Sequence, residues 1–439
     1  MRTTSQNSVD TVLPLAILPP QVPLDVEGYP RAPDGLELEQ VHVYVRHGER
    51  APVGVRLADR PAYIPPHWIM CKEANEFRRA VSSVSTDIMP IAVERLDRSS
   101  VQGECFLGQL TDLGRHSTYA YGASLRKLYV ERLGLLSESF EESGQIYLRS
   151  TNVPRTIESL QQIARGLCPQ TKCNHTLLPP ILVRNGKDEN LYGNTYACKR
   201  LEALQLGFTQ AAAAAFNPTL ESLDDKLSKY NGNNPIRVDG KPRASGIMDT
   251  IRAAVAHGIN VPAEFRDRCI VDTIERAIVS EWFAGYKTEE VRRLGMGPLL
   301  ADMSRKMQNK TEKGTNDPLK LLIHSTHDTA IAALCATLEV YDEKWPAFTS
   351  SITFELFKKG LAAPSTDQTV FSPFRQKPSS EHFVRVRHQN KNIALPICAE
   401  EGKHLPGHPE LCTFAAFRER VRELTPVDWE SECSTSSKV

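Results

Sequence analysis

Long apolar runs are missing from this 439-residue chain, and so is any excess of charge of one sign. No stretch approaches the roughly 18 to 20 apolar residues that a membrane-spanning helix needs, so we do not expect stable membrane insertion. Lysine and arginine together number 53, as do aspartate and glutamate. This balance provides no overall field to attract nucleic acid or an anionic membrane, so any attraction for an anion must be local.

Signatures of metal sites and of dense disulfide scaffolds are also missing. The ten cysteines include no C-x-x-C pair, and no metal-ligand spacing such as H-E-x-x-H occurs. We therefore expect neither a metal nor another cofactor. Cys398 and Cys412 flank a turn rich in glycine and proline. A disulfide and two free thiols both fit that pattern, because the redox compartment decides between them.

The first residues do not have the pattern of a secretory signal. Residues 1–10 are polar, and the one apolar patch, 11–18, is short and interrupted by proline. We therefore expect an intracellular protein, cytoplasmic or mitochondrial, in which the sequons at Asn174 and Asn309 are not glycosylated. Residues 1–36 contain many prolines, which predicts a flexible arm.

One short run organises the rest of the chain. Residues 41–45 alternate valine with histidine and tyrosine, a period of two that predicts a β-strand. The strand stops at Arg46 and His47, and Arg50 follows closely. Open α/β sheets bind ligands at the carboxyl ends of their strands, and the planar fork of arginine suits phosphate oxygens. A neutral histidine among them can attack phosphorus, so this run predicts a phosphate site.

Two further strands end in polar residues of the same kind. Residues 146–148 predict a buried strand that ends at Arg149, beside the amino terminus of a helix that favours anions. Residues 319–323 predict another strand, and His327 and Asp328 follow it. Asp328 could protonate a departing oxygen. Taken singly, the arginine could instead pair with a carboxylate, and the His-Asp pair could merely cap a helix.

The remaining pattern predicts an α/β core with a helical insertion. Residues 168–317 contain helical spacing and few strand signals, which predicts a mostly helical cap. Strand patterns return at 351–357 and 383–387, and we expect the latter at a sheet edge. The core therefore combines residues 37–167 with 318–425, and residues 426–439 form a tail.

The segment Arg46-His47-Gly48-Glu49-Arg50-Ala51-Pro52 resembles the R-H-G-x-R-x-P signature of the histidine acid phosphatases, a branch of the phosphoglycerate-mutase-like superfamily. The runs at 148–152 and 327–328 match further segments of that family, and the likeness is greatest to its lysophosphatidic-acid phosphatase branch. The resemblance implies a three-layer α/β sandwich with a helical cap. It also implies metal-independent hydrolysis of a phosphate monoester. In that reaction His47 would be the nucleophile and Asp328 the acid, while Arg46, Arg50, Arg149 and His327 would bind the phosphate.

Several alternatives stay open on the sequence. The substrate could be a lipid phosphate such as lysophosphatidic acid, or the inositol and sugar phosphates of phytase-like enzymes. A catalytically silent relative that only binds a phosphorylated ligand is a second class, although it would not need to keep every site residue. The other histidines lack matching partners in the sequence, so we assign them to packing or to the surface.

Overall fold

Nine strands of the described residues form one mixed sheet in the computed structural model. The structure describes residues 23–73, 75–76, 92–140, 143–173, 178–360 and 381–434. Residues 1–22 of the predicted arm, Asn174 and residues 435–439 of the predicted tail lie outside these ranges. Among the described residues, no helix is both long enough and apolar enough to cross a bilayer.

The sheet has the order β3-β2-β4-β1-β5-β6-β9-β8, and β7 pairs with β6. The strands are β1 Leu36–Arg46, β2 Ile146–Ser150, β3 Leu182–Val183, β4 Leu321–Thr326, β5 Ser351–Lys359, β6 His382–His388, β7 Lys391–Ile393, β8 His404–Leu405 and β9 His408–Thr413. Strands β1 to β4 run parallel, and the others are antiparallel. The prediction of an edge strand at 383–387 is wrong, because β6 lies between β5 and β9.

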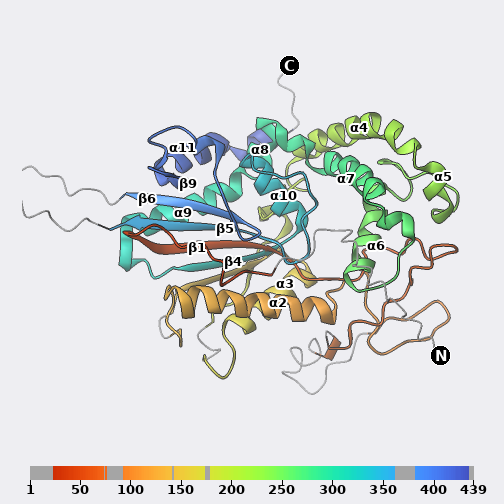
Figure 1. Cartoon of the computed structure of the whole chain (residues 1–439), viewed down its shortest axis with the longest axis horizontal. Helices are drawn as coiled ribbons and strands as arrows, with labels where there is room; N and C mark the ends of the chain where they lie inside the picture. The colour runs from red at the N-terminus through yellow and green to blue at the C-terminus, as the bar shows by residue number, and fades with distance from the viewer. Residues whose placement is uncertain are drawn as a thin grey trace, which may run out of the picture.

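The helices cover both faces of this sheet (Figure 1). They are α2 Asp112–Leu125, α3 Pro154–Leu167, α4 Lys199–Glu221, α5 Asp224–Leu227, α6 Ala244–Ala256, α7 Arg268–Phe283, α8 Glu289–Gly295, α9 Gly297–Lys313, α10 Asp328–Thr337, α11 Phe414–Leu424 and α12 Trp429–Cys433. Helices α2 and α3 lie below the sheet, α10 and α11 lie above it, and α9 packs with α11 on that same face. The prediction of an α/β fold is confirmed.

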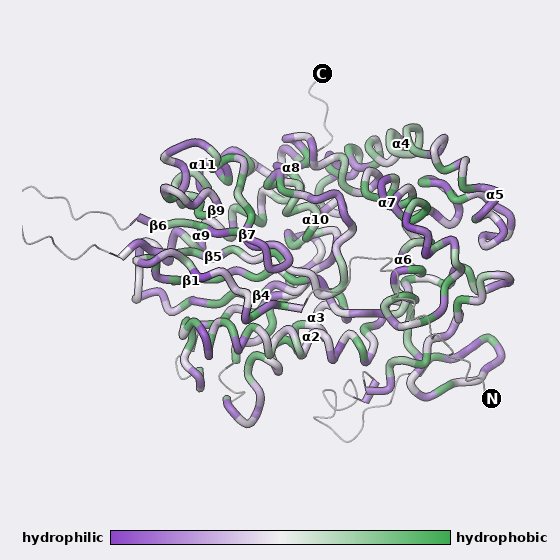
Figure 2. Tube along the Cα trace, in the orientation of Figure 1, coloured by the Kyte–Doolittle hydropathy of each residue, from purple (hydrophilic) through white to green (hydrophobic). Residues whose placement is uncertain are grey.

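The alternation in β1 explains why both faces are covered. On one face of the sheet, Val43 and Val45 pack with Leu125 of α2 and Ile163 of α3. On the opposite face, Tyr44 packs into a cluster with residues of α9, α10 and α11. Polar colour gathers on α5 and the outer turns, while the central strands carry mixed colour, as alternating residues do (Figure 2). Burial of apolar surface on each face therefore fixes the register of the strand that leads to the site.

The predicted cap segment supplies helices to two places. Helices α4, α6 and α7 lie beyond the carboxyl ends of β1 and β4, and α4 packs along α7 (Figure 1). Helix α9 instead packs on the sheet, where Leu300 and Met303 join the cluster of Phe354 and Phe417. The division into a core and a cap at residues 168 and 317 stays a prediction.

The predicted flexible arm includes residues that pack against the sheet. Tyr29 is buried, and its hydroxyl donates a hydrogen bond of 2.9 Å to Glu355 of β5. Arg385 of β6 donates to the other oxygen of Glu355 at 2.8 Å and to the Pro30 carbonyl at 2.8 Å. This buried, charge-assisted network holds Tyr29 and Pro30 against the sheet. The flexibility of the arm as a whole stays a prediction.

Three disulfides connect six of the ten cysteines. The pairs are Cys71–Cys105, Cys198–Cys433 and Cys398–Cys412. The last pair settles the choice that the sequence left open at that turn. The other two pairs have no local signature in the sequence, because their cysteines lie 34 and 235 residues apart.

Thiol counting tests this cysteine assignment. In denaturant without reductant, we expect four reactive thiols per chain, from Cys168, Cys173, Cys269 and Cys335. After reduction we expect all ten to react. Ten reactive thiols before reduction, in protein purified under non-reducing conditions, would contradict the three pairs.

Candidate active site

His47 lies at the carboxyl end of β1, next to the end of β4. The strands run in parallel with Arg46 opposite Thr326, and the His47 backbone N–H donates to the Thr326 carbonyl at 2.9 Å. Segments that are about 280 residues apart in the sequence therefore end side by side. The imidazole is buried at 1% exposure.

The environment of His47 fixes its protonation state. Nδ1 lies 2.8 Å from the Gly48 carbonyl oxygen, and a carbonyl can only accept, so Nδ1 carries a proton. Burial, followed by the charges of Arg46, Arg155 and Arg50, holds the pKa of His47 well below its usual range. The ring is therefore neutral, and Nε2 presents an unprotonated lone pair.

Gly48 permits a close backbone crossing just after the histidine. A Cβ atom at position 48 would lie 2.4 Å from the carbonyl oxygen of Gly114 in α2. A Cβ atom at Gly114 would in turn lie 2.1 Å from the Glu49 carbonyl oxygen. The Gly48 N–H also donates to Ser159 Oγ of α3 at 3.1 Å. The two glycines let the loop after β1 sit directly on α2 and α3, which sets the position of His47.

Arg46 and Asp328 form an ion pair beside the histidine. Nη2 of Arg46 lies 2.7 Å from Oδ2 of Asp328, and Nη1 donates to the Pro346 carbonyl at 2.7 Å. The guanidinium carbon lies 4.0 Å from the centre of the Phe348 ring. The Trp345 indole N–H donates to the same Asp328 oxygen at 3.0 Å. These contacts fix both charged groups at the sheet edge.

The neighbours of Asp328 control its charge. Burial raises the pKa of Asp328, but Arg46, Arg50, the Trp345 hydrogen bond and His327 outweigh burial and lower the pKa to about 2. The carboxyl group is therefore ionised at neutral and mildly acidic pH when these cations face it alone.

Arg50 connects the loop after β1 to helix α6. Nη2 of Arg50 lies 2.6 Å from Oδ1 of Asp249, and the Val53 backbone N–H donates to the other oxygen of Asp249 at 3.2 Å. The Arg50 guanidinium is buried, and its Nε has no hydrogen-bond partner among the described residues. Nη1 also donates to the Ala51 carbonyl at 3.1 Å, so Nε is the group left to donate to a bound ligand.

His327 precedes α10 and faces His47. The two ring centres lie 5.7 Å apart, and Nε2 of His327 lies 3.0 Å from the Thr151 hydroxyl oxygen at the end of β2. Burial, followed by the charge of Arg155, lowers the pKa of His327 to about 3, so its ring is neutral. It can therefore supply a neutral hydrogen-bonding group to a bound oxyanion.

Arg155 supplies a third guanidinium that the sequence analysis missed. It lies in the first turn of α3, and its charge acts on both His47 and His327. Burial, followed by repulsion from Arg50, lowers the pKa of Arg155 to about 10, and Nε has no hydrogen-bond partner among the described residues. The available signal was a second arginine at the helix amino terminus already predicted to favour anions.

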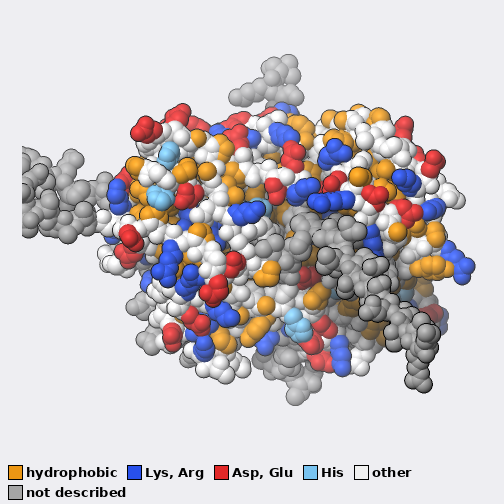
Figure 3. All heavy atoms as spheres, in the orientation of Figure 1, with side chains coloured by type: hydrophobic (Ala, Val, Ile, Leu, Met, Phe, Trp, Pro, Cys, Tyr) orange, Lys and Arg blue, Asp and Glu red, His pale blue; other side chains and the backbone are white. Residues whose placement is uncertain are grey.

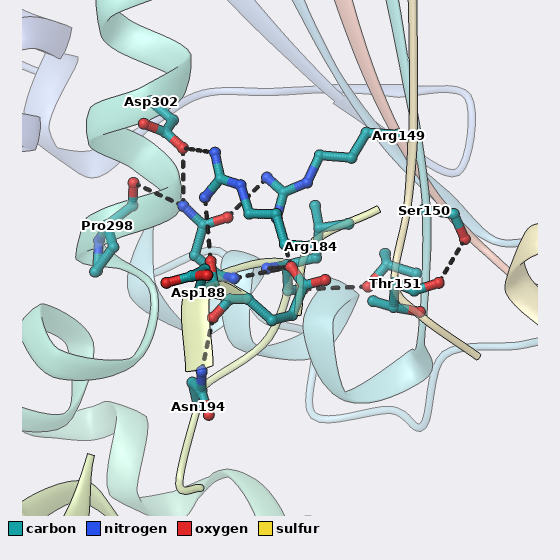
Figure 4. A network of polar contacts seen from close by, with 12 residues as sticks. Arg149, Ser150, Thr151, Arg184, Asp188, Asn194, Pro298 and Asp302 are labelled. Atoms are coloured by element: carbon teal, nitrogen blue, oxygen red, sulfur yellow. Dashed lines mark hydrogen bonds and ion pairs between the residues drawn. The ribbon is translucent and has the colours of Figure 1, made fainter. Parts of the chain in front are cut away.

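Arg149 does not join this group, which corrects its predicted role. Its Nη1 donates to Asn190 Oδ1 at 2.8 Å, and its Nη2 pairs with Glu189. Figure 4 shows this network continuing from Asn190 to Asp302 and Arg184. Arg149 therefore has a full carboxylate partner on the loop after β3, and it holds that loop in place.

The loop held by Arg149 borders the site. Tyr192 follows Glu189 and Asn190, and its ring centre lies 6.0 Å from that of His327. Just after β2, the Thr151 hydroxyl lies 3.0 Å from Nε2 of His327. Arg149 thus lies behind the cluster and binds the loop that borders it.

The sequence profile described as "Histidine phosphatase superfamily (branch 2)" matches residues 37–389. The chain belongs to this superfamily. A probable acid phosphatase of Schizosaccharomyces pombe is 33% identical over 451 residues, which cover 92% of this chain and 96% of that protein. Lysophosphatidic acid phosphatase type 6 of Homo sapiens is 26% identical over 331 residues, 74% of each chain. The family predicted from the sequence is confirmed.

Solved structures agree with the fold. The Hafnia alvei phytase in complex with tartrate superposes with a TM-score of 0.57 at 15% identity, and the match covers 92% of this chain and 100% of that one. In the present chain, the structure brings five of the six predicted site residues together and adds Arg155. The five are Arg46, His47, Arg50, His327 and Asp328.

Proposed function

We propose that the protein is a metal-independent acid phosphatase that hydrolyses phosphate monoesters through a phosphohistidine intermediate. One observation carries the proposal: the neutral imidazole of His47, with Nε2 unprotonated, lies among Arg46, Arg50 and Arg155. Three guanidiniums attract a phosphate dianion and stabilise the charge that spreads over its oxygens in the transition state. Membership of the histidine phosphatase superfamily and the acid phosphatase relative support the same activity.

In the first step, Nε2 of His47 attacks phosphorus, and the bond from phosphorus to the ester oxygen breaks. Asp328 transfers its proton to the departing alkoxide, which leaves as an alcohol. In the second step, Asp328 accepts a proton from water, which attacks phosphorus and releases phosphate and neutral His47. Arg46, Arg50 and Arg155 hold the equatorial oxygens throughout.

The first step requires a protonated Asp328, although its pKa is about 2 when only the cations face it. A bound phosphate dianion adds negative charge beside Arg46 and Arg50, which offsets their effect on the carboxyl group. Burial then dominates and raises the pKa of Asp328. Binding of the dianion therefore favours protonation of Asp328, and mildly acidic pH favours this reactive form.

We propose a lipid phosphate such as lysophosphatidic acid as the substrate. The lysophosphatidic acid phosphatase relatives support this class. Arg46, Arg50 and Arg155 together form a phosphate clamp, and apolar side chains also lie near it. Val53 is 46% exposed and Leu107 is 60% exposed. A Cβ atom at Gly108 would lie 3.3 Å from the Val53 side chain and 3.6 Å from Arg155, so this apolar rim adjoins a phosphate-binding residue. An acyl chain would cover that rim.

A substrate panel tests the activity and the lipid class separately. We expect phosphate release from p-nitrophenyl phosphate in the presence of EDTA, which a silent binding protein would not produce. Among lysophosphatidic acid, glucose phosphate and inositol hexakisphosphate, we expect the highest kcat/KM for lysophosphatidic acid. A higher value for inositol hexakisphosphate would favour a phytase-like role.

Alanine substitutions at the two arginines test the corrected assignment. We expect Arg155→Ala to lower kcat/KM about 10²- to 10³-fold with little change in stability, because it removes one donor to the transition state. Arg149→Ala should instead destabilise the fold by about 3–5 kcal/mol, because it leaves Glu189 buried and unpaired. Steady-state kinetics and urea unfolding separate the two results. A larger catalytic loss for Arg149→Ala than for Arg155→Ala, in fully folded protein, would support phosphate binding by Arg149.

The compartment is a further proposal. Three disulfides favour an oxidising compartment, whereas the sequence predicted an intracellular protein, cytoplasmic or mitochondrial. We therefore favour an oxidising compartment over the cytoplasm.

On the face shown in Figure 3, basic and acidic side chains are interspersed, in line with a substrate attracted by a local cluster.

A further inference from the structure

Helix α6 presents two charged residues on one face toward the site. Asp249 and Arg252 are three positions apart, a spacing that places side chains side by side on a helix. Asp249 pairs with Arg50 of the phosphate clamp at 2.6 Å. Arg252 must therefore lie close to the clamp as well, one turn further along the helix.

Arg252 is buried, and two of its nitrogens make no hydrogen bond among the described residues. It is 7% exposed, and among the described residues neither Nε nor Nη2 has a hydrogen-bond partner. Its nearest carboxylate, Glu275, lies 3.6 Å from Nη2, beyond hydrogen-bond distance, and Glu275 Oε1 already accepts from the Trp345 backbone N–H at 2.8 Å. A buried guanidinium with unused N–H groups is costly, so a purely structural role explains it poorly.

The surroundings of Arg252 place it on the leaving-group side of the site. Its guanidinium carbon lies 4.9 Å from the centre of the Trp345 ring, and the indole of Trp345 donates to Asp328. The charge of Arg252 also acts on Asp328, Asp249 and Arg46. Asp328 protonates the ester oxygen in the proposed mechanism, so the alcohol part of the substrate must extend past Asp328.

We propose that Arg252 binds an oxygen acceptor on the alcohol part of the substrate, close to the ester oxygen. The site would then select phosphate esters of polyols, including glycerol-based lipid phosphates, over esters of simple alcohols. This inference rests on the proposed phosphatase activity and adds a specificity determinant to it. A hydroxyl and a carboxylate oxygen both provide the required acceptor.

Matched three-carbon substrates test this role. Propyl phosphate and glycerol phosphate have the same chain length, but only the latter carries hydroxyl groups beside the ester. Phosphoglycerate adds a carboxylate and so distinguishes an anionic acceptor from a neutral one. We expect the wild-type protein to prefer glycerol phosphate or phosphoglycerate over propyl phosphate by about 10- to 100-fold in kcat/KM, the range of a hydrogen bond to a charged group.

The variant Arg252→Met/Glu275→Gln removes the guanidinium without leaving an unpaired buried carboxylate. We expect the preference for the oxygen-bearing substrates to fall to less than threefold. Arg276→Met, on the exposed side of α7, is the matched control and should keep the wild-type preference. Thermal unfolding verifies that each variant is folded.

Two results would overturn the inference: an equal loss of kcat/KM for all three substrates, or an unchanged preference in the double variant. If the double variant fails to fold, Arg252→Lys replaces it. A wild-type substrate preference in Arg252→Lys, with kcat/KM for propyl phosphate also unchanged, would count against recognition by the planar guanidinium. Wild-type protein that releases no phosphate even from p-nitrophenyl phosphate would contradict the proposed function itself.

Discussion

His47→Ala is expected to lower phosphate release by at least about 10⁴-fold, because the variant has lost the proposed nucleophile. His327 is the nearest alternative, but its ring centre lies 5.7 Å from that of His47, and its Nε2 is engaged by Thr151. The measurement is steady-state phosphate release together with trapping of labelled phosphoenzyme. The quench uses alkaline detergent, because the bond between nitrogen and phosphorus is labile in acid.

The matched control is His327→Ala, which removes a neighbouring imidazole but keeps the proposed nucleophile. We expect this variant to react more slowly and still to retain label on the protein. Label retained by His47→Ala would remove His47 from the nucleophile role. Circular dichroism verifies that His47→Ala has the wild-type fold. In folded protein, a lower thermal midpoint would not by itself explain a loss of label.

The sequence predicts the strands around the site well, because their signal is local. The valines of β1 fix its alternation and its end at Arg46, and the apolar run before His327 locates both ends of β4 within three residues. Parallel pairing of these strands then brings their polar ends together. The positions of His47 and Asp328 in one cluster follow from this reasoning, without any tertiary information.

The choice between Arg149 and Arg155 could not be made in the same way. Both arginines lie near the end of β2, and the pattern alone does not show which one has a carboxylate partner. That partner, Glu189, lies on a loop 40 residues away in a segment without strong periodicity. The contacts of Asp249, Arg252 and Trp345 are likewise tertiary, because α6 and the loop after α10 meet only when the chain folds.

Asp328→Asn is expected to lower kcat for alkyl phosphates by about 10²- to 10⁴-fold, because an alkoxide cannot leave without a proton. The variant also frees Arg46 from its ion pair, so phosphate esters should bind more tightly and KM should fall. For p-nitrophenyl phosphate the leaving phenolate needs no proton, so phosphorylation of His47 should remain fast. Hydrolysis of the phosphoenzyme would still lack its base, and the phosphoenzyme should accumulate.

Stopped-flow absorbance measures this difference directly. Asp328→Asn should give one equivalent of p-nitrophenol in a rapid burst, followed by slow turnover, whereas an alkyl phosphate should give no burst of alcohol. The wild-type kcat for alkyl phosphates should fall as pH rises through the pKa of Asp328 in the complex, and the variant should lack this dependence because asparagine does not titrate. Asp272→Asn, on the outer surface of α7, controls for the substitution itself. An equal loss for both substrates, without a burst, would assign Asp328 to phosphate binding and leave the acid to be found elsewhere.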